Sequence, residues 1–231
     1  MKTVYWSKYN FQTESNDLLW QLSPNQLYQY SKNNFSANLN DSLNWLKCPA
    51  SVDIMSKTWF IENQLDININ IKKDEVVYSD TIYSKNILNF RNFDDNYVIL
   101  DYLISLNMFC ESDLNISVFN PYIYPAKNLF AVPGKFNISK WFRPINPSFM
   151  AEIGKDISFK KGDPLLYFSF DTNEKINFKE FYFSDTLKEI SKELMLYKKY
   201  SKKNSLHSLY SSFSDKKINK IVLKEIKKMV I

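Results

Sequence analysis

The sequence predicts a mainly β protein, with an antiparallel sandwich or jelly-roll-like body over residues 1–186 and a basic helical segment over 187–231 packed on it. Three observations predict this α+β fold: short segments of alternating apolar and polar residues, Gly/Pro turn signals between them, and a helical period near the C-terminus. Regularly spaced strands without long intervening helices are typical of sandwiches and barrels. Hydrophobic residues make up 45% of the 231, enough to bury a core without disulfides.

The clearest strand pattern covers residues 65–72, where four aliphatic residues alternate strictly with polar ones. This alternation places the aliphatic side chains on one face of a half-buried strand. Further strand patterns cover residues 114–118, 127–132 and 176–183.

Two more strand patterns flank residues 161–164, whose sequence is Lys-Gly-Asp-Pro. A hairpin and a corner between sheets both fit a tight turn at which apolar patterning resumes at once. Asp163 can fix this turn by bonding its own backbone, or it can contact a ligand.

The period changes after Asp185, a residue that can cap a helix. Leu187, Ile190, Leu194 and Tyr197 recur at spacings of three and four, which predicts one helix, and residues 215–231 fit a second. The segment over 187–231 holds 12 Lys against 4 acidic residues. These helices can contact nucleic acid or another polyanion without base specificity, or their charged face can simply be solvated. The residues expected to contact a polyanion are Lys198, Lys199, Lys202 and Lys203.

Most residue patterns of known catalytic and metal sites are missing from the sequence. His207 is the only histidine and is expected in an exposed loop, so zinc sites built on two histidines are excluded. Isolated glycines exclude a P-loop and a dinucleotide fingerprint. Cys48 and Cys110 are expected to be buried free thiols. We therefore expect no metal and no cofactor, name no catalytic residue, and lean away from an enzyme.

No signal peptide or apolar span of membrane length is visible in the sequence, so we expect a protein that is soluble and not secreted.

Arg143 stands out because the chain uses 28 Lys and only 2 Arg. A guanidinium offers a rigid fork for carboxylate or phosphate and stacks on aromatic rings. Arg143 is therefore expected either to make an internal ion pair or stack, or to contact a ligand or partner. The candidate contact residues are Trp141, Arg143 and Asp163.

Four stretches, residues 2–7, 48–50, 136–145 and 157–165, resemble an uncharacterised protein family from tailed phages of marine bacteria. The resemblance covers residues 1–185 and implies a phage origin, with a location in the cytoplasm of the infected bacterial host or in the virion. It implies no functional residue, because that family has no assigned activity.

Three functions remain open on these grounds. The first is a phage accessory or structural protein that binds a protein partner, favoured by the many aromatic residues. The second is a small-ligand-binding protein or enzyme with a pocket near Trp141, Arg143 and Asp163. The third is a nucleic-acid-associated protein that uses the Lys-rich helices. A pocket that gathers Arg143 with acidic groups would favour the second.

Overall fold

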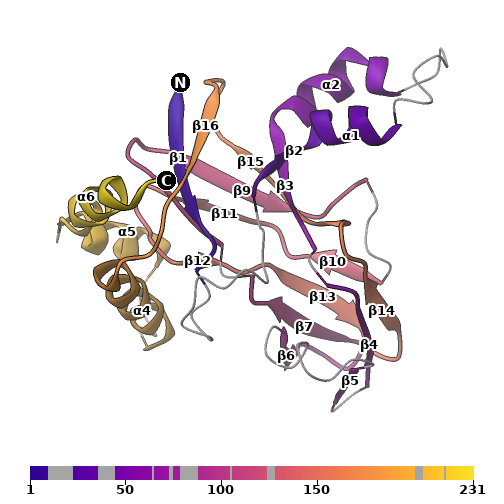
Figure 1. Ribbon diagram of the computed structural model, residues 1–231. Helices are drawn as coiled ribbons and strands as arrows, with labels where there is room; N and C mark the ends of the chain where they lie inside the picture. Colours follow the sequence, from indigo (N-terminus) through magenta and orange to yellow (C-terminus); the bar gives the residue numbers. More distant parts are fainter. Residues whose placement is uncertain are drawn as a thin grey trace.

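The computed structural model of the protein contains four mostly antiparallel sheets and a helical C-terminal segment (Figure 1). The α+β, mainly β class is therefore confirmed. The structure describes residues 1–9, 23–35, 45–63, 65–72, 75–78, 88–104, 106–123, 128–200, 205–215 and 217–231. Within these ranges, no helix combines the length and the apolar character that crossing a membrane requires.

The first sheet has the strand order β12-β8-β1-β16 and places the first strand of the chain beside the last. Strand β1 pairs antiparallel with β8 and parallel with β16. Both faces of β1 are buried: Val4 and Trp6 belong to the main core, while Tyr5 packs with the C-terminal helices. The strands are Lys2–Ser7 (β1), Leu106–Cys110 (β8), Pro144–Ile145 (β12) and Ile176–Glu180 (β16).

The second sheet is antiparallel, with the order β10-β13-β7-β6. Its β7 alternates regularly, so that Val98, Leu100 and Tyr102 are buried while Asp101 faces the other side. The register places Asp101 opposite Ser148 of β13. The strands are Leu88–Asn92 (β6), Tyr97–Tyr102 (β7), Leu129–Ala131 (β10) and Ser148–Glu152 (β13).

The third sheet has the order β11-β9-β15-β3-β2 and the fourth the order β14-β4-β5. The strand predicted at residues 65–72 is confirmed as β4, with Ile67, Ile69 and Ile71 buried. The strands are Asn25–Gln26 (β2), Thr58–Glu62 (β3), Ile67–Ile71 (β4), Val76–Tyr78 (β5), Asn115–Phe119 (β9), Gly134–Asn137 (β11), Asp156–Phe159 (β14) and Pro164–Phe170 (β15).

Residues 161–164 form a corner between sheets, and the hairpin alternative is wrong. Strand β14 pairs with β4, whereas β15 pairs with β3 and β9. Gly162 takes φ +88° at this corner, a left-handed conformation that glycine adopts without steric cost.

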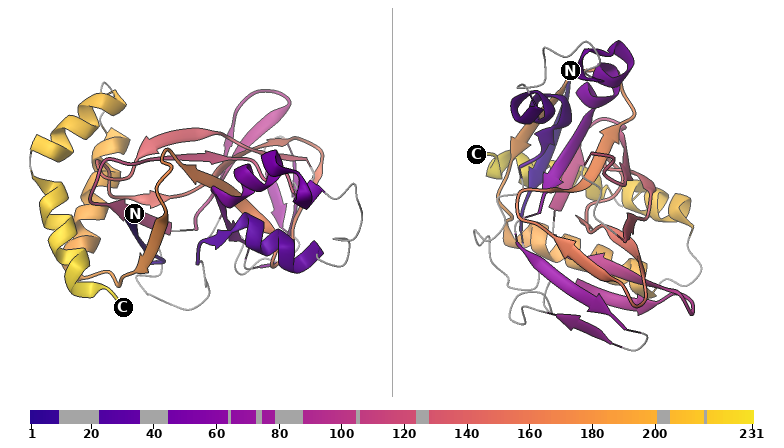
Figure 2. Two further views of the ribbon diagram at one scale, coloured as in Figure 1. Left: turned by 90° about the horizontal axis from the view of Figure 1, so that it is seen from above. Right: turned by 90° about the vertical axis from the view of Figure 1, so that its right-hand side faces the viewer.

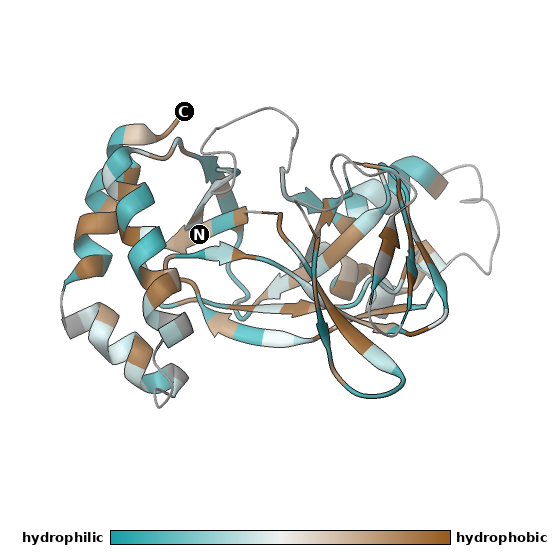
Figure 3. Cartoon of the chain, turned by 90° about the horizontal axis from the view of Figure 1, so that it is seen from below, coloured by the Kyte–Doolittle hydropathy of each residue, from teal (hydrophilic) through white to brown (hydrophobic). Residues whose placement is uncertain are grey.

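Two groups of helices lie at opposite ends of the sheets (Figure 2). Hydrophobic residues recur among hydrophilic ones along the C-terminal helices (Figure 3). These helices pack on the β1 sheet through a cluster of buried aromatic and aliphatic side chains. The helices are Leu27–Phe35 (α1), Trp45–Lys47 (η2, a 3₁₀ turn), Pro49–Ser56 (α2), Asp185–Tyr200 (α4), Leu206–Asp215 (α5) and Ile218–Met229 (α6).

The structure corrects two local predictions in this helical segment. Ser184, not Asp185, caps α4, because its Oγ accepts a hydrogen bond from the Leu187 N–H at 3.3 Å. Asp185 instead pairs with Lys188 at 2.9 Å. His207 is exposed as predicted, but it lies on α5 rather than in a loop.

Candidate functional site: a cleft with two arginines

A cleft of about 640 Å³ opens where strands of three sheets meet. Its lining is mixed, and its apolar part includes Val118 from β9, Phe136 from β11 and Leu166 from β15. Both arginines of the chain line it, and Asp101 is the one carboxylate among its described lining residues. A concave apolar surface with a few charged groups is the usual form of a small-molecule site.

Arg91 and Asp101 form one wall of the cleft as an ion pair. Strands β6 and β7 are neighbours, and the register places Arg91 opposite Ile99, two residues from Asp101. Side chains in this diagonal arrangement share one face of the sheet. The Arg91 Nη2 lies 3.2 Å from the Asp101 Oδ1, and the Ser148 Oγ donates a hydrogen bond to the same carboxylate oxygen.

Arg143 is held differently, by an aromatic ring rather than a carboxylate. It follows two buried residues, Trp141 and Phe142, and its Cζ lies 5.5 Å from the centre of the Trp141 ring. This is the cation–π contact that an arginine beside a tryptophan allows. The side chain is half-buried, and burial lowers the pKa of the Arg143 guanidinium.

Tyr210 of α5 links the C-terminal helices to the sheets and lies close enough to Arg143 to interact with it electrostatically. Its hydroxyl accepts a hydrogen bond from the Asn137 N–H at 2.8 Å. Burial raises the pKa of the Tyr210 phenol, so the hydroxyl stays neutral and brings no countercharge to Arg143. No carboxylate of the described ranges lies within ion-pair distance of Arg143.

The structure brings together two of the three predicted contact residues. The buried Trp141 ring packs against Arg143 without lining the cleft itself, and Asp163 does not line the cleft either. Asp163 sits at the corner before β15, where its backbone carbonyl accepts a hydrogen bond from the Asn63 N–H at 2.8 Å. Of the predicted polyanion contacts, Lys202 and Lys203 lie outside the described residues, as do the side chains of Lys198 and Lys199.

Sequence reasoning missed Arg91 and Asp101. The signal that pointed to Arg143, an arginine in a chain that otherwise uses lysine, applies equally to Arg91. Neither residue lies near Arg143 in the sequence, so only the packing of the sheets shows that the three charged groups share one cleft.

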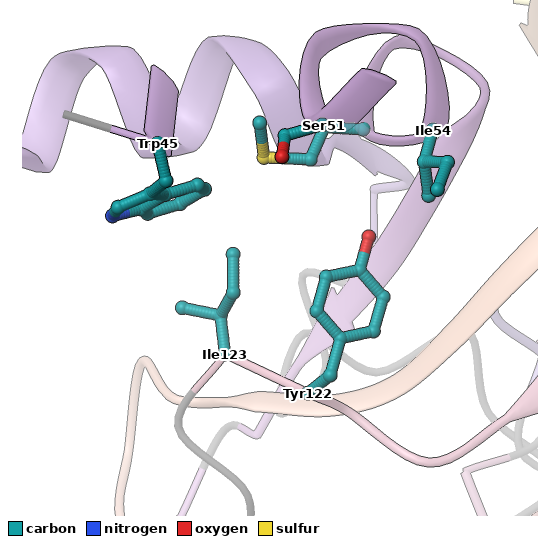
Figure 4. A pocket seen from close by; sticks show the side chains of 6 residues that line it. Trp45, Ser51, Ile54, Tyr122 and Ile123 are labelled. Atoms are coloured by element: carbon teal, nitrogen blue, oxygen red, sulfur yellow. The ribbon is translucent and has the colours of Figure 1, made fainter. Parts of the chain in front are cut away.

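A second hollow, of about 480 Å³, lies between α2 and the segment after β9 (Figure 4). Three large side chains at this apolar groove are exposed to solvent: Trp45 by 40%, Ile54 by 57% and Tyr122 by 48%. Cys48, predicted to be buried, is exposed, because it is the single residue between η2 and α2 and is the N-cap residue of α2. Hydrogen bonds from Ser51 lower the pKa of its thiol.

The chain matches no protein-family model, no curated protein and no solved structure. In the described part of the chain, no three His, Cys, Asp or Glu side chains gather as a metal site would require.

Proposed function

We propose that the protein binds a small organic anion with an apolar body in the two-arginine cleft. One observation carries the proposal: the half-buried Arg143 lines the cleft and has no carboxylate partner among the described residues. A partly buried charge is costly unless an opposite charge or hydrogen bonds compensate it. A bound carboxylate would supply that charge and accept hydrogen bonds from the guanidinium fork.

The walls of the cleft support the apolar half of the ligand. Val118, Val132 and Phe136 provide surface that an aliphatic chain or ring would cover, which contributes roughly 25 cal/mol per Å² removed from water. In this proposal the body acts as a sandwich-like binding module, with the cleft between its layers. The proposal is one of binding and includes no catalytic step.

Titration of the full chain with octanoate tests this function. We expect octanoate to bind and 1-octanol, which has the same chain length without the charge, to bind at least about tenfold more weakly, because a hydrogen-bonded charge pair contributes more than a neutral one. Isothermal titration calorimetry measures both. A Lys155→Gln control removes a charge on a residue that does not line the cleft and is expected to change neither affinity. Equal affinities for the two probes would contradict the proposal.

A second candidate function is protein binding through the apolar groove of Figure 4. Exposed Trp and Tyr side chains around a hollow are the composition of interface hot spots, so the proposed occupant is one apolar side chain of a partner protein. We keep the phage origin within this proposal, with the partner in the infected cell or the virion.

Ile54→Glu tests this second function, since it places a charge at the groove. We expect proteins captured from infected cells by the wild-type chain to be lost with Ile54→Glu and retained with Asp53→Asn, a change at an exposed neighbour that does not line the groove. Cross-links from the captured partner should map to α2. Identical capture by all three chains would remove the groove from consideration.

A further inference from the structure

Arg91 and Arg143 line the same cleft, but only the charge of Arg91 is compensated by a neighbouring carboxylate. Asp101 neutralises Arg91 through the 3.2 Å ion pair, whereas Arg143 contacts only neutral groups among the described residues. The three charged lining groups therefore sum to a single positive charge, located at Arg143. We infer that the cleft selects a singly charged organic anion and rejects a dianion, an inference that rests on the function proposed above.

The rejection follows from how firmly Asp101 is held. Its carboxylate bonds to Arg91 and to the Ser148 hydroxyl, and all three residues sit on paired strands rather than on loops. The second charge of a dianion that approaches Arg91 comes close to the Asp101 carboxylate, which already accepts a hydrogen bond from the Arg91 Nη2 at 3.2 Å. That placement brings two carboxylates next to one another, and they repel because one arginine cannot neutralise both; the Asp101 side chain, only 23% exposed, is little screened by water, although Arg91 itself is 64% exposed.

Asp101 thus acts as a built-in competitor for the second arginine. Specificity by repulsion of this kind is a general way to exclude a ligand whose attractive contacts would otherwise suffice. The ligand class that fits the cleft is a monocarboxylate, or another singly charged anion, whose remaining atoms are uncharged and lie on the apolar walls.

Suberate and its monomethyl ester give a matched test, because the two share one carbon chain and differ in one charge at neutral pH. We expect the wild-type chain to bind the monoester at least about tenfold more tightly than suberate. This comparison needs no variant, so it does not depend on how any substitution folds. Suberate binding as tightly as the monoester would overturn the inference while leaving anion binding intact. Failure of octanoate and of both suberate probes to bind would overturn the proposed function as well.

Substitutions of the ion pair then locate the selectivity. Asp101→Asn frees Arg91, keeps an oxygen to accept the Ser148 hydrogen bond, and should strengthen suberate binding about tenfold more than monoester binding. Arg91→Gln removes one positive charge and should weaken monoester binding. The double variant restores the single net charge and should return monoester affinity to near the wild-type value. Equal effects of Asp101→Asn on both ligands would show that Arg91 is out of reach of the ligand, and would overturn the inference.

Discussion

Replacing Arg143 with methionine is expected to weaken octanoate binding by at least about tenfold without destabilising the fold. The guanidinium stacks on Trp141 and is partly desolvated with no carboxylate partner among the described residues, so its charge contributes little net stability to the folded state. Methionine has a similar length and can cover the same ring. Losing a charge-assisted hydrogen bond to the ligand costs about 1.5–3 kcal/mol, which weakens binding roughly 10- to 150-fold.

Two measurements on one variant separate a functional arginine from a structural one. Chemical denaturation should give Arg143→Met a free energy of unfolding equal to or above that of the wild-type chain, while calorimetry shows that octanoate binds more weakly. Arg143→Lys is the matched control: it keeps the charge but loses the bidentate fork, so its affinity should lie between the two. If Arg143→Met unfolds more easily by about 2 kcal/mol or more and binds octanoate as tightly as the wild-type chain, Arg143 is a structural residue and does not hold the charge of the ligand.

The parts of the fold that the sequence predicts well are those set by local patterns. Strand β4 follows from strict alternation, and α4 from apolar residues at helical spacing. Strand pairing is not local, and there the prediction was incomplete. Residues 161–164 fit a hairpin as well as a corner until β14 is seen to pair with β4 instead of β15. The parallel pairing of β1 with β16 joins two segments that lie far apart in the sequence, and no local pattern signals it.

The candidate site shows the same limit in chemical terms. Arg143 could be selected from the sequence because its residue type is rare in this chain and it follows closely after a tryptophan. Asp101 could not be selected, since one aspartate in an alternating strand is an ordinary solvent-facing residue. Its role follows only from the diagonal placement of Arg91 across β6 and β7 and from Ser148 on β13.

Removing residues 185–231 is expected to cost the body its cooperative fold. The tail covers a buried aromatic cluster on the β1 sheet that includes Tyr5, Phe109, Phe142 and Phe181, and each such ring buries about 150–250 Å². The tail also extends the sheet edge, since the Ile231 N–H donates to the Glu180 carbonyl at 3.1 Å. We expect the truncated chain to bind a hydrophobic dye and to unfold without a sharp transition. A sharp thermal transition near that of the full chain would contradict this.

The same packing decides how the tail should be tested for nucleic-acid binding. Loss of binding on truncation would carry no information about the lysines, because the whole body would be disturbed. Substituting Lys198, Lys199, Lys202 and Lys203 with Gln keeps the apolar residues of the tail, so the variant should melt like the wild-type chain. If these lysines neutralise phosphates of double-stranded DNA, the slope of log affinity against log salt should become shallower by about 0.9 for each lysine that does so. An unchanged slope in a folded variant would exclude these four residues as the polyanion site and leave the cleft as the protein's anion-binding surface.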